Sequence, residues 1–166
     1  MKTDAIISPD GKYRYRLVRQ WDETRDFACF IMLNPSTADS EKNDPTIRRC
    51  ISFAAGFGYG GIVVVNLFPF RATLPSELCG AEYPWGEGNV RHIQDALVLS
   101  PIGIAIAAWG VLNGKIGERS NYVIEWLKGW NRGTIYCLGK TKDGFPRHPL
   151  YVRKDQPLEE FWSKPE

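Results

Sequence analysis

Two segments far apart in the chain each end in a polar residue that adjoins a proline. Asn34 follows the apolar run 27–33, and His148 lies one loop beyond the apolar run 134–138. Such runs are typical of buried strands, and open α/β sheets bind ligands at the carboxyl edge of their strands. An asparagine carbonyl can orient a water molecule without being ionised, and a histidine N–H can stabilise developing negative charge. We therefore expect Asn34 and His148 to face one pocket, where they would suit a hydrolytic reaction.

Buried strands are expected to position both residues. Continuous apolar runs predict four strands that are covered on both faces, at 27–33, 62–68, 103–109 and 134–138. The segment 13–21 alternates arginines with aromatic or aliphatic residues, which predicts a half-buried strand at an edge of the sheet, where an antiparallel direction is also open to it.

Helical spacing of apolar residues predicts three helices between these strands. One begins after Asp44 and one after Asn89, each acting as an N-cap, and the third has Tyr122 on its buried stripe. The stretch 72–88 reads as a long irregular loop. Because helices alternate with apolar strands, the predicted fold class is α/β, a three-layer α/β/α sandwich with a mostly parallel four-stranded central sheet plus the N-terminal edge strand.

Length and composition limit the class of protein. A chain of 166 residues is about one domain, so residues 1–166 are expected to form a single α/β/α domain. No apolar stretch approaches 18 residues and none resembles a signal peptide, which predicts a cytoplasmic protein without a membrane partner. The four cysteines show no C-x-x-C spacing, so we expect free thiols, no metal and no cofactor. The sequence leaves the oligomeric state open.

The four strand ends carry further candidates for lining the pocket. These substrate-binding candidates are Pro35, Ser36, Asn66, Phe68, Phe70, Arg71, Trp109 and Gly110. Most also have a purely structural interpretation. Asn34 and Asn66 can hydrogen-bond to loop backbone, Arg71 can form a surface ion pair, and the aromatic residues can belong to the core rather than stack on a ligand.

Two aspartates and a second histidine are further candidates for a functional or a structural role. Asp39 lies in the polar stretch after Asn34 and is a candidate catalytic base. Asp44 is better explained as a helix cap, and His92 as a structural or exposed helix residue.

The whole chain resembles the bacterial and phage family known as domain of unknown function 1643. The resemblance covers roughly residues 5 to 162 and is carried by four runs: 32–39, 43–46, 66–73 and 146–151. It implies no activity.

The order of the parts is also similar, more distantly, to the uracil-DNA glycosylase superfamily, whose members hold a parallel four-stranded sheet between helices. The run 33–36 resembles the first motif of its mismatch-specific branch, Gly-x-Asn-Pro-Gly, with Leu and Ser in place of the glycines. The resemblance implies that Asn34 positions the attacking water and that His148 stabilises charge on the departing base. An Asn in place of the Asp of the most active uracil enzymes argues against strong uracil excision.

The remaining motifs of that superfamily have partial counterparts. A middle strand that ends in Asn and is followed by Arg matches Asn66 and Arg71, and a later strand that ends in Trp-Gly matches Trp109 and Gly110. The last motif is His-Pro-Ser, where this chain has Leu150 in place of the serine. In members of that superfamily, the loop that follows this motif inserts into DNA.

The resemblance implies cleavage of the N-glycosidic bond of a flipped base, with nucleic acid, in the first place DNA, or a nucleotide as partner. The expected nucleic-acid contacts are Lys140, Lys142, Arg147, Leu150, Tyr151 and Arg153, with Leu150 or Tyr151 as the wedge. A net charge of only +2 gives weak support for nucleic-acid binding. Two alternatives stay open: a non-catalytic nucleic-acid or nucleotide-binding module, and an N-glycosidase of free nucleosides or nucleotides.

Overall fold

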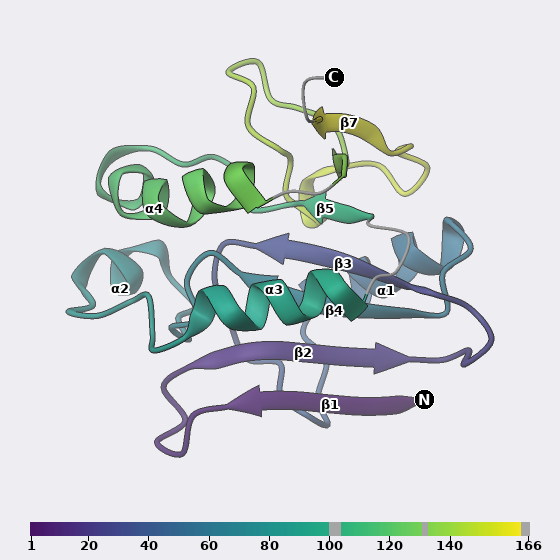
Figure 1. Cartoon of the computed structure of the whole chain (residues 1–166), viewed down its shortest axis with the longest axis horizontal. Coiled ribbons are helices and arrows are strands. Elements are labelled where there is room, and N and C mark those ends of the chain that lie inside the picture. The colour runs from purple at the N-terminus through teal and green to yellow at the C-terminus, as the bar shows by residue number, and fades with distance from the viewer. Residues whose placement is uncertain (100–103, 131–132, 164–166) are drawn as a thin grey trace.

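The computed structural model describes residues 1–99, 104–130 and 133–163, which build one seven-stranded sheet in the order β1-β2-β4-β3-β5-β6-β7 (Figure 1). The strands are β1 Lys2–Ile7, β2 Arg14–Gln20, β3 Phe27–Met32, β4 Gly61–Asn66, β5 Ala105–Ala107, β6 Ile135–Cys137 and β7 Glu159–Trp162.

Four parallel strands form the centre of this sheet. β3 pairs with β4 on one side and with β5 on the other, and β5 pairs with β6, all in parallel. β2 runs antiparallel to β4, and β1 and β7 add antiparallel strands at the two edges. The predicted α/β class and parallel centre are confirmed, but the predicted strand number is wrong. The 13–21 strand is β2, and it is not an edge strand because β1 lies outside it.

Helices cover both faces of the sheet. Figure 1 shows α3 in front of the sheet and α1 behind it. One core cluster joins alternate residues of β3 and β4, such as Ile31 and Val65, to the helices α2, α3 and α4. The other joins the intervening residues, such as Phe30 and Val64, to α1. The helices are α1 Pro45–Gly56, α2 Pro75–Gly80, α3 Asn89–Leu99 and α4 Gly114–Trp130, with a 3₁₀ turn, η1, at Pro149–Tyr151.

Asp44, Asn89 and Tyr122 were each expected to have a defined place at or in a helix. Asp44 caps α1 as expected, since its Oδ1 accepts a hydrogen bond from Ile47 N at 2.8 Å. Asn89 is the first residue of α3, and its Nδ2 donates instead to the carbonyls of Asn66 and Leu67 in β4 and the loop after it. Tyr122 is 68% exposed and does not belong to the buried stripe of α4.

The stretch 72–88 contains the short helix α2 in addition to loop. The expected start of the third strand at residue 103 lies outside the described residues. The four cysteines are free thiols, and three of them are buried. Within the described ranges, no helix combines the length and apolar character needed to span a membrane.

Candidate functional site

The carboxyl edge of β3 and β4 holds Asn34 in a defined orientation. The ladder continues past the strands, because Leu67 N donates to Met32 O and Phe68 N to Leu33 O, both at 2.9 Å. Asn34 Nδ2 then donates to Pro35 O at 3.0 Å and to Ala72 O at 2.9 Å. The amide nitrogen is therefore committed to the loop backbone. Its Oδ1 accepts no hydrogen bond from the described residues, and the side chain is only half-buried, so the oxygen can accept a hydrogen bond from water.

His148 lies on the neighbouring loop in one fixed tautomer. Its Nδ1 accepts a hydrogen bond from Leu150 N at 3.2 Å, so Nδ1 carries no proton and the neutral ring carries its proton on Nε2. Burial lowers the pKa of His148, and the nearby Asp44 carboxylate only partly opposes that effect. The ring is therefore a neutral donor at neutral pH, and its Nε2–H has no acceptor among the described residues.

Asp44 connects the two loops electrostatically. Its Oδ2 accepts a hydrogen bond from Ala38 N at 3.4 Å, in the loop that follows Asn34, and its charge acts on His148. The side chain of Arg49 on α1 donates to Pro149 O at 3.1 Å and also to Val152 O, which fixes η1 against the same helix. No hydrogen bond joins Asn34 to His148 within the described part of the chain, but both loops are attached to the first turns of α1.

Gly110 provides a second connection to the segment 139–151, which carries His148 and is called the histidine loop below. Its N–H donates to Pro146 O at 3.0 Å, and a Cβ at this position would lie 3.8 Å from His148 Cβ. The backbone of Gly110 has φ +79°, a conformation that favours glycine. The end of β5 and the histidine loop therefore lie side by side.

Two buried arginines of β2 support the loop 36–44, and the first is Arg14. A bulge in the β1–β2 pairing pairs Ile6 with Arg16 but Ile7 with Arg14, which breaks the two-residue alternation. Arg14 is only 2% exposed, and its Nη1 donates to Ala38 O at 2.8 Å. Burial lowers its pKa to about 10 although Asp44 opposes this shift, and its Nε has no hydrogen-bond partner among the described residues.

Arg19 supports the same loop from further along β2. It is fully buried, its Nε donates to Asn43 Oδ1 at 2.7 Å, and its Nη2 donates to the carbonyls of Asp39 and Lys42 at 2.5 and 3.1 Å. Neither Arg14 nor Arg19 was a site candidate in the sequence. The loop carbonyls they bind lie 20 to 24 residues away, and an arginine in an alternating strand predicts a solvent-facing side chain.

Asn66 is a buried amide without partners. It is 1% exposed, and neither Nδ2 nor Oδ1 makes a hydrogen bond to the described residues. By strand alternation with Val64, its side chain is on the α1 face of β4, at the end where Asn34 follows β3. Leaving a buried polar group unsatisfied costs about 1–3 kcal/mol. Such a group at this edge indicates a place where water or a ligand completes the structure.

The aromatic candidates are mostly core residues. Phe68 is fully buried beside Trp85, and Trp109 is 3% exposed and packs against Phe161 and Trp162 of β7. In this conformation neither ring presents a free face to a ligand. Phe70 is half-buried and packs edge-to-face on Tyr13.

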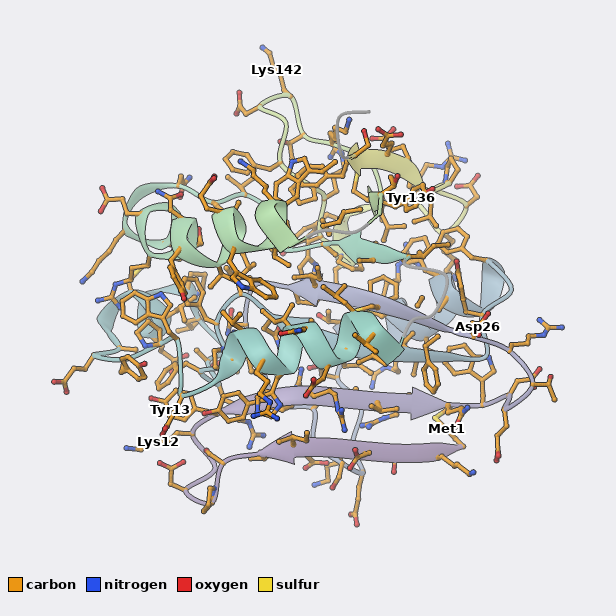
Figure 2. The ribbon with its side chains drawn as sticks, in the orientation of Figure 1. Met1, Lys12, Tyr13, Asp26, Tyr136 and Lys142 are labelled. Atoms are coloured by element: carbon orange, nitrogen blue, oxygen red, sulfur yellow. The ribbon has the colours of Figure 1, made fainter. Side chains whose placement is uncertain are left out.

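The histidine loop also carries most of the predicted nucleic-acid contacts. Leu150 and Tyr151 directly follow Pro149 and are 43% and 79% exposed, and the Tyr151 ring lies 5.4 Å from that of His148. Lys142 lies on the projecting loop 139–147, where Figure 2 shows its side chain directed away from the body of the protein. Lys140 and Arg147 are exposed on the same loop.

Arg153 and Asp39 are engaged differently from what was expected. Arg153 forms a bidentate pair with Asp155, at 2.8 and 3.0 Å, which neutralises its charge. Asp39 Oδ1 accepts from the N–H groups of Glu41 and Lys42, both at 2.8 Å, and these hydrogen bonds lower the pKa of the carboxyl. A carboxylate with a lowered pKa is a weaker base.

The other candidates lie on the loops of the same edge. Pro35 is buried and its carbonyl accepts from Ala72 N, whereas Ser36 is half-buried. Arg71 Nη1 donates to Gly11 O at 3.3 Å, so this side chain reaches toward the β1–β2 turn. Across the described residues there is no cluster of three His, Cys, Asp or Glu side chains that could hold a metal ion.

Comparison with family models identifies the relatives of the chain. A model for the family "Protein of unknown function (DUF1643)" matches residues 14–150. The chain belongs to this family. The match includes β2 with both buried arginines, the Asn34 loop, α1 and His148. Neither the curated proteins nor the solved structures gave a match.

Proposed function

We propose that the protein hydrolyses the N-glycosidic bond of a base in nucleic acid, at the carboxyl edge of β3, β4 and β5. The observation that carries the proposal is the state of His148. The Leu150 N–H fixes the tautomer, and burial keeps the ring neutral, so a single Nε2–H donor remains available. A preorganised donor of this kind is worth about 3–4 kcal/mol of transition-state stabilisation, or 10²–10³ in rate.

In the proposed reaction, the bond between the sugar carbon and the base nitrogen breaks as a water oxygen bonds to that carbon. The bonding electrons leave with the base, whose conjugated oxygen receives the Nε2–H hydrogen bond of His148. Asn34 Oδ1 accepts a hydrogen bond from the attacking water and orients it. The amide takes no proton, so the proton lost by the water passes to solvent or to the departing base. Asp39 has no part in this mechanism.

Asn66 supplies a way to recognise the base. A side-chain amide offers one donor and one acceptor next to each other, which match the adjacent C=O and N–H of a nucleobase edge. Both side-chain polar atoms of Asn66 lack partners among the described residues and are shielded from solvent, so a base edge that reaches them when the loops over this end of β4 open would satisfy two buried polar groups. Bases that present this lactam edge are therefore favoured as substrates.

Exposed apolar residues beside His148 favour a polymeric substrate over a free nucleoside. Flipping a base out of a duplex costs a few kcal/mol, and an inserted side chain can fill the space that the base leaves. Leu150 and Tyr151 are exposed on η1, within two and three residues of the proposed donor. The similarity of the motif order to the uracil-DNA glycosylase superfamily supports the same proposal.

The proposal is tested with a panel of oligonucleotides, each carrying one damaged or modified base in a single- or double-stranded context. Free base is detected by mass spectrometry after incubation with the wild-type protein, with free nucleosides as parallel substrates. Release from oligonucleotides is expected, with little or none from nucleosides. Release from nucleosides alone would overturn the choice of substrate.

A second candidate function is binding of nucleic acid without chemistry. It is favoured by the state of Asp39, which is the carboxylate nearest to Asn34 in the chain. Hydrogen bonds hold this carboxylate in a turn and lower its pKa, so it is a weak base for activating a water molecule. This function predicts salt-dependent binding of oligonucleotides without release of any base.

A further inference from the structure

Three hollows on the α3 and α4 side of the sheet share the side chain of Tyr83. Their volumes are about 700, 620 and 220 Å³, and the two smaller ones also share Trp85 and Tyr122. Tyr83 and Tyr122 are 55% and 68% exposed, so their rings are accessible from solvent. None of the nucleic-acid or catalytic candidates contributes to these walls.

The smallest hollow, lined by Tyr83, Trp85, Asn89 and Tyr122 among others, is rigidly supported. Trp85 Nε1 donates to Arg119 O at 3.0 Å, and Arg119 Nη1 donates to Ala81 O at 2.7 Å, which together fasten the 81–85 loop to α4. The volume of 220 Å³ suits one long side chain better than a drug-sized ligand, whose pockets begin at about 300 Å³.

Asn89 provides a buried acceptor in the wall of this hollow. It is 4% exposed, and its Nδ2 is committed to the carbonyls of Asn66 and Leu67 in the sheet. Its Oδ1 is buried and has no partner among the described residues. Because an unpaired buried acceptor is costly, a ligand that brings an N–H donor to this oxygen would be stabilised.

The charged side chains that line the hollows sharing Tyr83 are Asp10, Glu87, Glu118 and Arg119, so acidic groups outnumber the one basic group and favour a cation. Glu118 lines the adjoining 620 Å³ hollow, and Glu87 lines the 700 Å³ one; neither forms an ion pair within the described part of the chain. Arg119 already places its guanidinium 5.3 Å from the centroid of the Trp85 ring. This aromatic surface therefore stacks with a planar cation in its own structure.

From these observations we propose that the hollow between Tyr83, Trp85 and Tyr122 binds an alkylguanidinium group. The planar cation stacks on the exposed tyrosine rings, donates one hydrogen bond to Asn89 Oδ1 and directs a second N–H toward Glu118. Guanidinium fits because it combines several N–H donors with a flat, weakly hydrated face, which a lysine ammonium lacks. The group can belong to a free small molecule or to an arginine side chain of a peptide. The site is independent of the proposed hydrolytic activity.

The test follows the side-chain amide resonances of Asn89 by NMR while three probes are added at low millimolar concentration. The probes are butylguanidinium chloride, acetyl-Gly-Arg-Gly-amide and acetyl-Gly-Lys-Gly-amide. Saturable shifts are expected with the first two and not with the lysine peptide. Tighter binding of the arginine peptide than of butylguanidinium would assign the site to a peptide, and equal binding would assign it to a small molecule.

Substitutions at exposed positions of α4 locate the site without disturbing the fold. Glu118→Gln and Tyr122→Ala are each expected to weaken binding about two- to fivefold, as for an exposed ion pair and an exposed cation–π contact. Glu125→Gln, on the same helix but outside the hollow, is the matched control and should bind like the wild type. Absence of saturable shifts, equal binding of the lysine peptide, or unchanged binding in both test variants would overturn the proposal.

Discussion

Arg14→Met should leave the protein about as stable as the wild type, or slightly more stable, while loosening the loop 36–44. Burial lowers the pKa of Arg14 from its usual value to about 10, which corresponds to about 3 kcal/mol of unfavourable free energy for the cation. Because the cation is the disfavoured form, this cost is present at neutral pH and disappears only as the pH rises above 10. Methionine occupies a similar volume and removes the cost.

The substitution also removes one favourable interaction. The hydrogen bond from Arg14 Nη1 to Ala38 O involves a charged donor and is worth about 1.5–3 kcal/mol. The difference between the two terms is a gain of about 0 to 1.5 kcal/mol in the free energy of unfolding. Since Ala38 O then has no partner in β2, amide hydrogens of the loop 36–44 should exchange faster than in the wild type.

Arg19→Met is the matched comparison on the same strand. Arg19 donates to Asn43, Asp39 and Lys42 in this loop, so its loss leaves three acceptors without their donor. We expect a loss of about 2–4 kcal/mol. Urea denaturation measures both free energies, and hydrogen exchange followed by mass spectrometry reports on the loop. A loss above about 3 kcal/mol for Arg14→Met would refute the reasoning, because it would show that the buried cation is a net stabiliser.

Four further predictions concern the histidine loop. Asp44→Asn keeps a good helix cap but removes the charge that raises the pKa of His148. The midpoint of the His148 titration followed by NMR should therefore fall further below the usual value of about 6.5. An unchanged or higher midpoint would contradict the assigned contact. In the wild type, where the folded-state pKa already lies below the unfolded value, the contribution of His148 to stability is complete above pH 6.5 and is lost as the pH falls below it, which urea denaturation at several pH values would detect. Gly110→Ala forces an L-residue to φ +79° without a steric clash, so the free energy of unfolding should drop by about 1–2 kcal/mol, and a neutral effect would show that the turn relaxes freely. Tyr151→Ala should change stability by no more than about 0.5 kcal/mol yet weaken oligonucleotide binding about five- to a hundredfold in a fluorescence anisotropy assay, whereas unaffected binding would remove the wedge role.

Much of the fold could be predicted because the central strands are recognisable from their apolar composition. Each of the four parallel strands lies within a continuous apolar run, and Asp44 followed by Pro45 is a strong helix-start signal. The edge strands could not be predicted in this way. Polar residues such as Lys2 and Glu159 occupy exposed positions of β1 and β7, so these strands show neither an apolar run nor a clear alternation.

The arrangement of the candidate site was predictable only in part. The strand-end rule correctly placed Asn34, Asn66 and Gly110 at one edge, because it depends on topology alone. Sequence could not separate buried from exposed aromatic residues at that edge, and Trp109 is buried because β7, which was not expected, packs on it. The roles of Arg14 and Arg19 depend on contacts between a strand and a distant loop, for which a single sequence carries no signal.

The central claim is that Asn34 orients the water while neutral His148 stabilises the departing base. The most direct test is the single-turnover rate of base release from the oligonucleotide that the wild-type protein cleaves fastest. Asn34→Ala and His148→Ala are each expected to slow this step about 10²- to 10³-fold. Because Asn34→Ala also removes the hydrogen bonds to Pro35 O and Ala72 O, its free energy of unfolding should fall by about 1–3 kcal/mol, so the rates are compared at a temperature where unfolding curves show both variants fully folded. Release at the wild-type rate by either variant, or no release by the wild-type protein from any oligonucleotide, would contradict the account.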